Sequence, residues 1–409
     1  MRPLTLGRAT DLLESLKALI DERCPLLTRA TIAGGVRRFE PLVFKPVIVA
    51  SAADRAPALD QLCALEGVED VRIRTTSNAL LVWQQAEIDV RVAAPHEFGS
   101  VLFHATGESR HVKAVQARIG RAIRATREED VYREARLPFI VAELRNGTGE
   151  IERAAEGLLP VLVERSDIRG DLHMHSTYSD GQDTLDAMVA ACVEIGYEYI
   201  AITDHSESAA ASRTVSRDQL ARQRDEIENL RSRFPQIAIL HGLEADILPD
   251  GRLDFEDSVL ETLDLVLASL HDPAGQDPGT LTRRCLKAIS HPMVNVITHP
   301  ANQLVGRRGG YPLDFDSIYA AATETGTALE IDGAPSHLDL DGEHARAAVE
   351  AGVTVTIDSD CHRAAALDRQ MRFGVGTARR GWVQKGQVLN ARPLEEVRAF
   401  ITAKRSLVG

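Results

Sequence analysis

Several features that define other classes of protein are missing from this 409-residue sequence. No window reaches the roughly 18 apolar residues that a membrane-spanning helix needs. The N-terminus also lacks the charged and then apolar pattern of a signal peptide. The five cysteines stand far apart without a CxxC pair, as is typical of reduced cytosolic proteins. We therefore expect a soluble, cytoplasmic protein with no membrane partner.

An excess of positive charge is also absent, and the charge imbalance that exists lies in one part of the chain. Residues 1–170 hold 24 basic and 24 acidic side chains, so the formal net charge of −13 belongs entirely to the residues that follow. An acidic surface repels nucleic acid until cations or local arginines offset its charge. Charge therefore gives no support to strong nonspecific DNA binding.

The length of the chain alone predicts two domains.

Apolar β-type runs alternate with helical patterns seven times in the second part of the chain. The helix after the first run is clear, since Leu185, Met188 and Val189 fall on one face, and Gly196 and Gly326 sit where helices should end. Strict alternation implies parallel strands with right-handed crossovers, closed or nearly closed into a barrel. The expected strands lie near residues 167–172, 199–203, 237–243, 264–270, 294–298, 327–332 and 353–358.

Polar side chains follow six of these strands, and only the sixth strand has no obvious ligand after it. His173 and His175 project from one face of the first strand, because side chains alternate, and Asp180 lies in the next turn. Strand ends of a parallel barrel share one face, where active sites are built. We therefore expect six histidines and three carboxylates to converge. They are His173, His175, Asp180, His205, Glu244, His271, His299, Asp360 and His362.

Nine candidate ligands exceed the needs of one ion, since a catalytic zinc takes about three protein ligands plus water. We therefore expect two to three divalent ions, and the mixed imidazole and carboxylate set suits zinc, manganese or iron. Such a cluster activates water at neutral pH and holds a phosphoryl group between ions about 3.5–4 Å apart. Phosphoester hydrolysis is the predicted chemistry, with amide hydrolysis as its main competitor. We expect Glu244, His271 and Asp360 to act in catalysis.

The segments that carry these residues resemble the PHP (polymerase and histidinol phosphatase) domain. They are residues 171–180, 203–205, 242–246, 269–271, 298–300 and 358–362. The resemblance implies a distorted (β/α)7 barrel, similar to a TIM barrel, that binds up to three metals. All nine ligand positions of that family are filled here, and Glu244 matches its bridging carboxylate.

Three further segments, 248–251, 306–311 and 374–382, look like the PHP domain of bacterial family X DNA polymerases. Within them, Arg307, Arg308 and Arg379 are candidates to clamp a substrate phosphate, the alternative being ordinary surface arginines. The sequence departs from the family pattern near the site. Asp332 stands where Asn is usual, Cys361 replaces a small residue, and Gln303 replaces Arg. These departures bear on substrate specificity.

The N-terminal part is similar to the palm of the same polymerases, with Gly34 and Gly35 at the nucleotide-binding turn. A polymerase palm holds two magnesium ions with three carboxylates, two of them in an Asp-x-Asp strand start. Here that strand begins at residues 44–47 without a carboxylate, and only Asp89 matches the third. We predict that nucleotide addition is lost. The expected domains are a degenerate palm and thumb-like α+β domain at 1–140, a linker at 141–166 and the PHP barrel at 167–409.

Basic residues cluster between 110 and 127, several of them at spacings of three on a predicted helix. This pattern is typical either of a solvated helix face or of a track for a phosphate backbone. The residues are Arg110, Lys113, Arg118, Arg121, Arg124 and Arg127. The remaining histidines are interpreted as residues that support ligands or lie on the surface. They are His96, His104, His111, His241, His291, His337 and His344.

The function that fits these patterns is metal-dependent phosphoester hydrolysis. The resemblance implies a substrate at a DNA 3′ end, cut by 3′–5′ exonuclease or end-processing activity. One alternative is a small-molecule phosphatase of the histidinol-phosphate type. A second alternative is a non-catalytic DNA-binding or scaffold protein, against which the nine filled ligand positions argue. The sequence indicates no oligomeric state.

Overall fold

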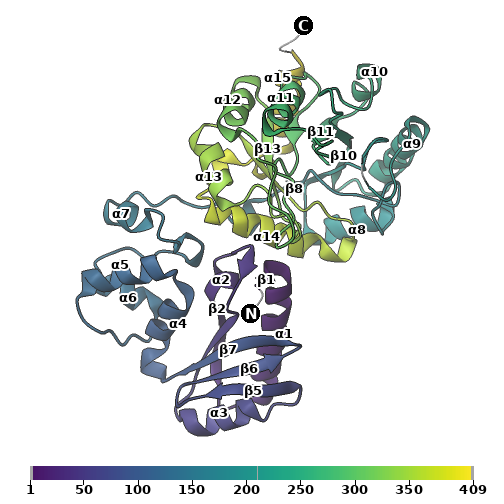
Figure 1. Cartoon of the computed structure of the whole chain (residues 1–409). Helices are drawn as coiled ribbons and strands as arrows, with labels where there is room; N and C mark the ends of the chain where they lie inside the picture. The colour runs from purple at the N-terminus through teal and green to yellow at the C-terminus, as the bar shows by residue number, and fades with distance from the viewer. Residues whose placement is uncertain (1–2, 210, 407–409) are drawn as a thin grey trace. The chain divides into compact units, whose positions relative to one another are not determined.

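The computed structural model describes residues 3–209 and 211–406 (Figure 1). The chain divides into two compact units between Pro160 and Val161. This division falls inside the stretch that we interpreted as a linker. None of the helices formed by the described residues combines the length and the apolarity that crossing a membrane requires.

The first unit is an α+β region built on a five-stranded sheet of order β2-β4-β7-β6-β5. Its strands are β1 (Leu4–Thr5), β2 (Thr28–Ala33), β3 (Leu42–Val43), β4 (Val47–Ser51), β5 (Val68–Arg74), β6 (Asn78–Trp83) and β7 (Ala86–Ala93). Its helices are α1 (Leu6–Arg23), α2 (Gly34–Arg37), α3 (Arg55–Cys63), α4 (Phe98–Thr106), α5 (Ser109–Ile119), α6 (Glu128–Glu134) and α7 (Glu150–Ala155). Helix α1 is amphipathic and buries an apolar face that includes Leu12, Leu16 and Ile20.

A buried polar network ties α5, α6 and α7 together. His111 on α5 contacts the Glu150 carboxylate on α7 through Nδ1 at 2.6 Å and the Tyr132 hydroxyl on α6 through Nε2 at 2.8 Å. Glu150 also accepts the backbone N–H of Thr148 at 2.7 Å. Helix α7 therefore packs within the first unit, although its residues belong to the predicted linker.

The basic helix predicted between residues 110 and 127 is shorter than the sequence pattern suggested. Helix α5 ends at Gly120, whose left-handed φ of 70° breaks the helix at low cost for a residue without Cβ. Arg121 and Arg124 therefore lie beyond the helix, on an irregular segment where they pair with Glu134 and Glu97. The spacing of three between these arginines has no helical meaning.

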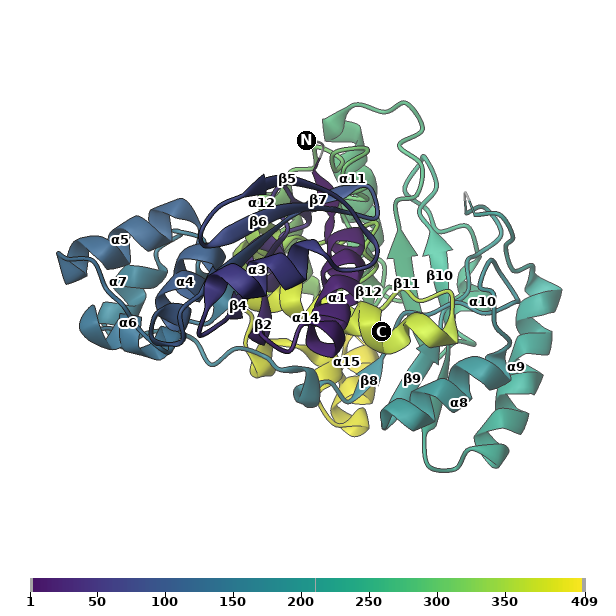
Figure 2. The same ribbon diagram turned by 90° about the horizontal axis from the view of Figure 1, so that it is seen from below.

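The second unit is a parallel seven-stranded barrel with helices around it. Its strands are β8 (Gly170–Asp171), β9 (Tyr199–Ile202), β10 (Ala238–Asp246), β11 (Leu265–Ser269), β12 (Val296–Ile297), β13 (Ala328–Asp332) and β14 (Val355–Asp358). Its helices are α8 (Leu185–Ile195), α9 (Arg217–Arg233), α10 (Asp257–Leu260), α11 (Pro278–Ile289), α12 (Phe315–Thr325), α13 (Gly342–Glu350), α14 (Leu367–Arg380) and α15 (Leu394–Arg405). Figure 2 shows α8 and α9 lying outside β9 and β10.

All seven predicted strands are confirmed, and they follow one another across the sheet in chain order, each parallel to the next. Strand residues alternate between two buried clusters, as the pleat requires. On β9, Tyr199 and Ala201 belong to one cluster, while Ile200 and Ile202 pack in the other. Helices α8 and α12 end at Gly196 and Gly326, as their glycines predicted. Burial on both faces explains why these strands are continuous apolar runs.

The first and last strands meet through side chains, because no continuous ladder joins β8 to β14. Asp358 accepts the backbone N–H of Leu172 at 2.7 Å, and Asp171 accepts that of Ser359 at 3.1 Å. The buried Asn390 amide spans the same seam. It donates to the carbonyls of Gly170 at 2.9 Å and Ile357 at 2.6 Å, and its oxygen accepts the N–H of Ile357. The Asn390 amide therefore supplies hydrogen bonds between the first and last strands, where no backbone ladder joins them.

We expect Asn390→Ala to lower the free energy of unfolding of the second unit by about 2–4 kcal/mol, because several buried backbone groups lose their partners. Urea denaturation followed by Trp382 fluorescence in a Trp83→Phe background measures this unit. Asn229→Ala, which removes an exposed amide on α9, is the control and should change stability by less than about 0.5 kcal/mol. Equal costs for the two variants would show that the seam does not depend on Asn390.

Candidate metal centre

The site begins with the extended segment that leaves β8. His173 and His175 project to the same side, their rings 5.0 Å apart and their Nε2 atoms 3.1 Å apart. Both side chains are fully buried. The segment is held by backbone bonds on both sides, from His175 to Cys361 and from Thr203 to Met174. The strand alternation that predicted a shared direction for the two imidazoles is the cause of their proximity.

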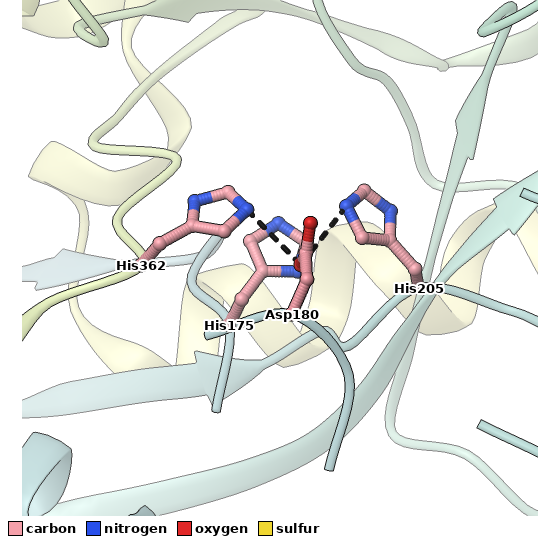
Figure 3. A group of neighbouring side chains, drawn as sticks. All are labelled: His175, Asp180, His205 and His362. Atoms are coloured by element: carbon pink, nitrogen blue, oxygen red, sulfur yellow. Dashed lines mark ion pairs between the residues drawn. The ribbon is translucent and has the colours of Figure 1, made fainter. Parts of the chain in front are cut away.

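Asp180 reaches the same point because its turn folds back over the segment. Asp204 pins this turn by accepting the backbone N–H groups of Ser176 at 2.8 Å and Ser179 at 3.1 Å. Gly181 follows, where a Cβ atom would approach Ser176 backbone atoms to 2.6 Å. Asp180 then faces His362 at 3.2 Å and His205 at 3.5 Å, as Figure 3 shows.

Glu244 on β10 is the hub of the cluster. Its buried carboxylate lies 2.7 Å from His205 Nδ1 and 2.9 Å from His299 Nε2. His271, His173 and His175 present Nε2 atoms at 3.4, 3.5 and 3.8 Å. Five imidazoles from different parts of the chain therefore surround one carboxylate.

The segments that follow β12 and β14 complete the cluster with strained backbone. Asp360 lies 3.1 Å from His175 and has a φ of 47°, and His299 has a φ of 25°. Residues other than glycine rarely adopt positive φ, and such strain gathers at functional sites.

The structure thus brings all nine predicted ligand residues together at the carboxyl ends of the barrel strands. Eight of them form three overlapping groups whose ligand atoms lie within 4.8 Å of one another, and His299 joins through Glu244. The groups are His175, Asp180, His205 and His362; His173, His175 and Asp360; and His205, Glu244 and His271.

The donor atoms fit divalent cations. Several of them are buried and face only other members of the cluster, without a hydrogen bond of regular geometry, among them Asp180 Oδ1, His205 Nδ1 and Glu244 Oε2. Buried polar atoms are rarely left unpaired, so atoms that converge in this way are suited to a cation. Imidazole nitrogens mixed with carboxylate oxygens are the ligands that zinc, manganese and iron prefer.

Crowding sets the charge of these side chains. Burial opposes ionisation of Glu244, yet His271, His173 and His205 hold the pKa of its carboxyl well below the usual value. Burial also opposes protonation of His271, but the Glu244 carboxylate raises its pKa to about 10. The ionised Glu244 carboxylate and the protonated form of His271 thus stabilise each other. A divalent cation would displace such a proton, because metal ligands bind in deprotonated form.

Sequence reasoning missed the side chains that support the ligands. Asp204 holds the Asp180 turn, Asp246 contacts His271 Nδ1 at 3.0 Å, and Glu330 contacts His173 Nδ1 at 2.6 Å. His337, by contrast, was among the histidines interpreted as supporting or surface residues, and from the loop after β13 it stacks on His299 with ring centroids 5.5 Å apart. One signal was available for Glu330, since a charged residue within an apolar strand requires a buried partner.

The three candidate phosphate-binding arginines lie in two places. Arg307 and Arg308 are exposed on a turn, where Arg308 donates to the Asn302 carbonyl at 2.7 Å. The Asn302 amide donates in turn to the carbonyls of Leu270 and His271, so this turn adjoins the cluster. Arg379 lies near the end of α14 and donates to the Val163 carbonyl at 3.0 Å. Val163 precedes β8 in the chain, whereas the ligand residues His173 and His175 follow that strand.

Comparison with known proteins adds independent findings. Residues 171–299 match the family model of the PHP domain. The chain is 36% identical over 389 residues to the DNA polymerase/3′-5′ exonuclease PolX of Bacillus subtilis, a match that covers 90% of this chain and 68% of that protein. It is 34% identical over 166 residues to a probable phosphatase of Syntrophotalea carbinolica. That match covers 39% of this chain and 64% of the phosphatase.

Among solved structures, histidinol phosphate phosphatase of Lactococcus lactis aligns with a TM-score of 0.42 and 18% identity, over 53% of this chain and 94% of that one. The PolX match is different in extent, because it spans both units and two thirds of the relative. The chain therefore belongs to the PolX family, with a PHP domain as its second unit.

Proposed function

We propose that this protein is a metal-dependent phosphoesterase that hydrolyses phosphoester bonds at DNA 3′ ends and no longer adds nucleotides. The observation that carries the proposal is the buried Glu244 carboxylate facing five imidazoles at the carboxyl ends of the barrel strands. The PolX relative, whose name includes a 3′–5′ exonuclease, supports the choice of DNA because it matches both units.

The nine side chains would hold two to three divalent cations, with zinc, manganese and iron as the candidates. When bound, such cations lower the pKa of water and offset the charge of a phosphoryl group. Exposure indicates where substrate approaches. His173, His175 and Glu244 are fully buried, whereas His362, Asp180 and His271 keep 32%, 19% and 16% of their side chains exposed. The partly exposed members form the opening of the site, here called the mouth. The buried members lie beneath them and are closed to solvent.

Individual residues then have distinct roles in the proposed reaction. Glu244 is placed to ligate more than one cation, since both of its oxygens face imidazoles. His271 is oriented through its Nδ1 contact with Asp246, which directs Nε2 toward Glu244. Arg307 and Arg308 lie on a turn joined to His271 through Asn302, from which they can reach a phosphate at the mouth. Arg379, which donates to the Val163 carbonyl, stays a candidate on the resemblance alone.

A small-molecule phosphatase is the second candidate, and one observation favours it. The net charge of −13 falls entirely after residue 170, so the net charge of the barrel opposes the approach of a polyanion. The two candidates differ in whether the first unit takes part. Its exposed arginines are available, since Arg121 and Arg124 are 63% and 75% exposed and their surface ion pairs are weak.

The test compares a labelled single-stranded oligonucleotide with a chromogenic phosphate monoester, both with manganese. If the first unit guides DNA, Arg121→Ala with Arg124→Ala should slow DNA cleavage and reduce the log–log salt slope by about 0.7 for each lost phosphate contact. Monoester hydrolysis should not change. The control is Arg72→Ala with Arg74→Ala, which removes two exposed, ion-paired arginines from β5.

Three outcomes would count against the DNA assignment. Equal effects of the two double variants on DNA cleavage would show that the Arg121 segment carries no specific contact. Monoester turnover far above DNA cleavage, without salt dependence, would favour the small-molecule phosphatase. Metal binding without hydrolysis of either substrate would favour a non-catalytic protein.

A further inference from the structure

Glu330 occupies the middle of β13, the one barrel strand that supplies none of the nine candidate ligands. Every residue of this strand is buried, and Glu330 has no solvent exposure. A buried carboxylate is costly unless it is paired and hydrogen-bonded. Its position inside an apolar strand therefore requires specific partners, and both of its partners belong to the metal centre.

The two oxygens of Glu330 hold two different ligand-bearing segments. Oε1 lies 2.6 Å from Nδ1 of His173, in the segment that follows β8. Oε2 accepts the backbone N–H of His299 at 2.8 Å, just past β12. The Glu330 carboxylate thus joins the segment after β8, the first barrel strand, to the segment between β12 and its own strand, β13.

The contact with His173 fixes which nitrogen is free to bind metal. When Nδ1 donates its proton to a carboxylate, Nε2 carries the lone pair. His173 Nε2 is the atom that faces the cluster, at 3.5 Å from Glu244 and 3.6 Å from Asp360. The reverse tautomer would present an N–H group to a cation and could not ligate it.

The contact with His299 holds a strained backbone. His299 has a φ of 25°, and its Nε2 lies 2.9 Å from Glu244. Such a conformation persists only when its surroundings impose it. The bond from its N–H to Glu330 is one such constraint, because it fixes the peptide group that precedes the imidazole.

We propose that Glu330 is a positioning residue of the metal centre, which sets the tautomer of His173 and the backbone of His299 so that both imidazoles can bind divalent cations. The inference rests on the proposed function, since it assumes that the cluster binds metal. The competing explanation is that Glu330 serves only the stability of the barrel.

The chain contains a matched control for that explanation. In the first unit, Glu150 contacts His111 Nδ1 with the same 2.6 Å distance, and its second oxygen accepts a backbone N–H at 2.7 Å. Both carboxylates and both histidines are fully buried. Glu150→Gln therefore removes an equivalent buried interaction away from the metal centre.

The experiment uses the full chain as wild type, Glu330→Gln and Glu150→Gln. Zinc affinity is measured by competition with a chelator of known affinity, the visible spectrum is recorded after loading with cobalt(II), and thermal unfolding is followed in EDTA. We expect Glu330→Gln to weaken zinc binding about 10–100-fold and to alter the cobalt spectrum. Glu150→Gln should lower the unfolding temperature while leaving both metal readouts unchanged.

Wild-type zinc affinity and cobalt spectrum in Glu330→Gln would overturn the inference, even if that variant were less stable. If Glu330→Gln does not fold, Glu330→Asp takes its place, because it keeps the charge but shortens the reach to both partners. Unchanged metal binding in Glu330→Asp would equally overturn the inference. A wild-type protein that binds no metal would instead refute the proposed function.

Discussion

Replacing Glu244 with Gln will abolish phosphoester hydrolysis while the barrel stays folded. Glu244 is the carboxylate that five imidazoles face, so its loss removes the charge that joins the three ligand groups. Losing several kcal/mol of charge stabilisation lowers the rate by roughly 10³-fold or more, at about tenfold per 1.4 kcal/mol. Gln has nearly the same volume as Glu, so packing around β10 is preserved. Asp360→Asn should act in the same direction.

The measurement combines initial rates on both substrates, elemental analysis and circular dichroism. Wild-type protein should carry two to three metal equivalents, and Glu244→Gln should carry fewer with an unchanged spectrum. Glu150→Gln, which alters a buried carboxylate of the first unit, should keep both metal and hydrolysis. Active wild-type protein with less than one metal per chain would contradict this account, as would full activity in Glu244→Gln.

The sequence predicted the barrel and the nine clustered residues because both depend on local pattern. Parallel strands buried on both faces appear as apolar runs, and a barrel collects the residues that follow them at one end. The HxH pair needed only strand alternation to place His173 and His175 together. These features require no knowledge of which strands are neighbours.

Contacts between distant segments could not be predicted in this way. Glu330 meets His173 across 157 positions, and Asn390 meets Gly170 across 220. Their partners are set by the closure of the barrel and not by any local period. The prediction of a basic helix was wrong in its extent for the opposite reason. The regular spacing of the basic residues continues past Gly120, whereas the helix ends there. A periodic pattern is evidence for a helix only up to the residue, such as a capping glycine, that ends the helix.

The arginines show a further limit of pattern matching. Arg308 and Arg379 looked equivalent in sequence because both lie in segments that resemble the same family. The structure places Arg308 on a turn next to Asn302 and the cluster, whereas Arg379 donates to the Val163 carbonyl before β8. Resemblance identifies which segments belong to a family, but the fold decides which side chains share a face.

Primer extension will be absent with any nucleotide and with either magnesium or manganese. Strand β4 pairs in parallel with β7 so that Val47 lies opposite Asp89, and the segment leading into β4 is Phe44-Lys45-Pro46. Asp89 itself accepts a hydrogen bond from Arg91 at 2.8 Å. One carboxylate that is already paired with a guanidinium cannot hold the two metal ions that nucleotide transfer requires.

A template-directed assay with labelled primer measures this, with the PolX protein of Bacillus subtilis as the positive control. Asp89→Asn separates the two activities within this chain. It should leave hydrolysis by the second unit unchanged, because Asp89 lies on β7 of the first unit. Incorporation above a metal-free control would contradict the prediction. Its disappearance in Asp89→Asn would then assign the activity to the first unit and require a second carboxylate near β4.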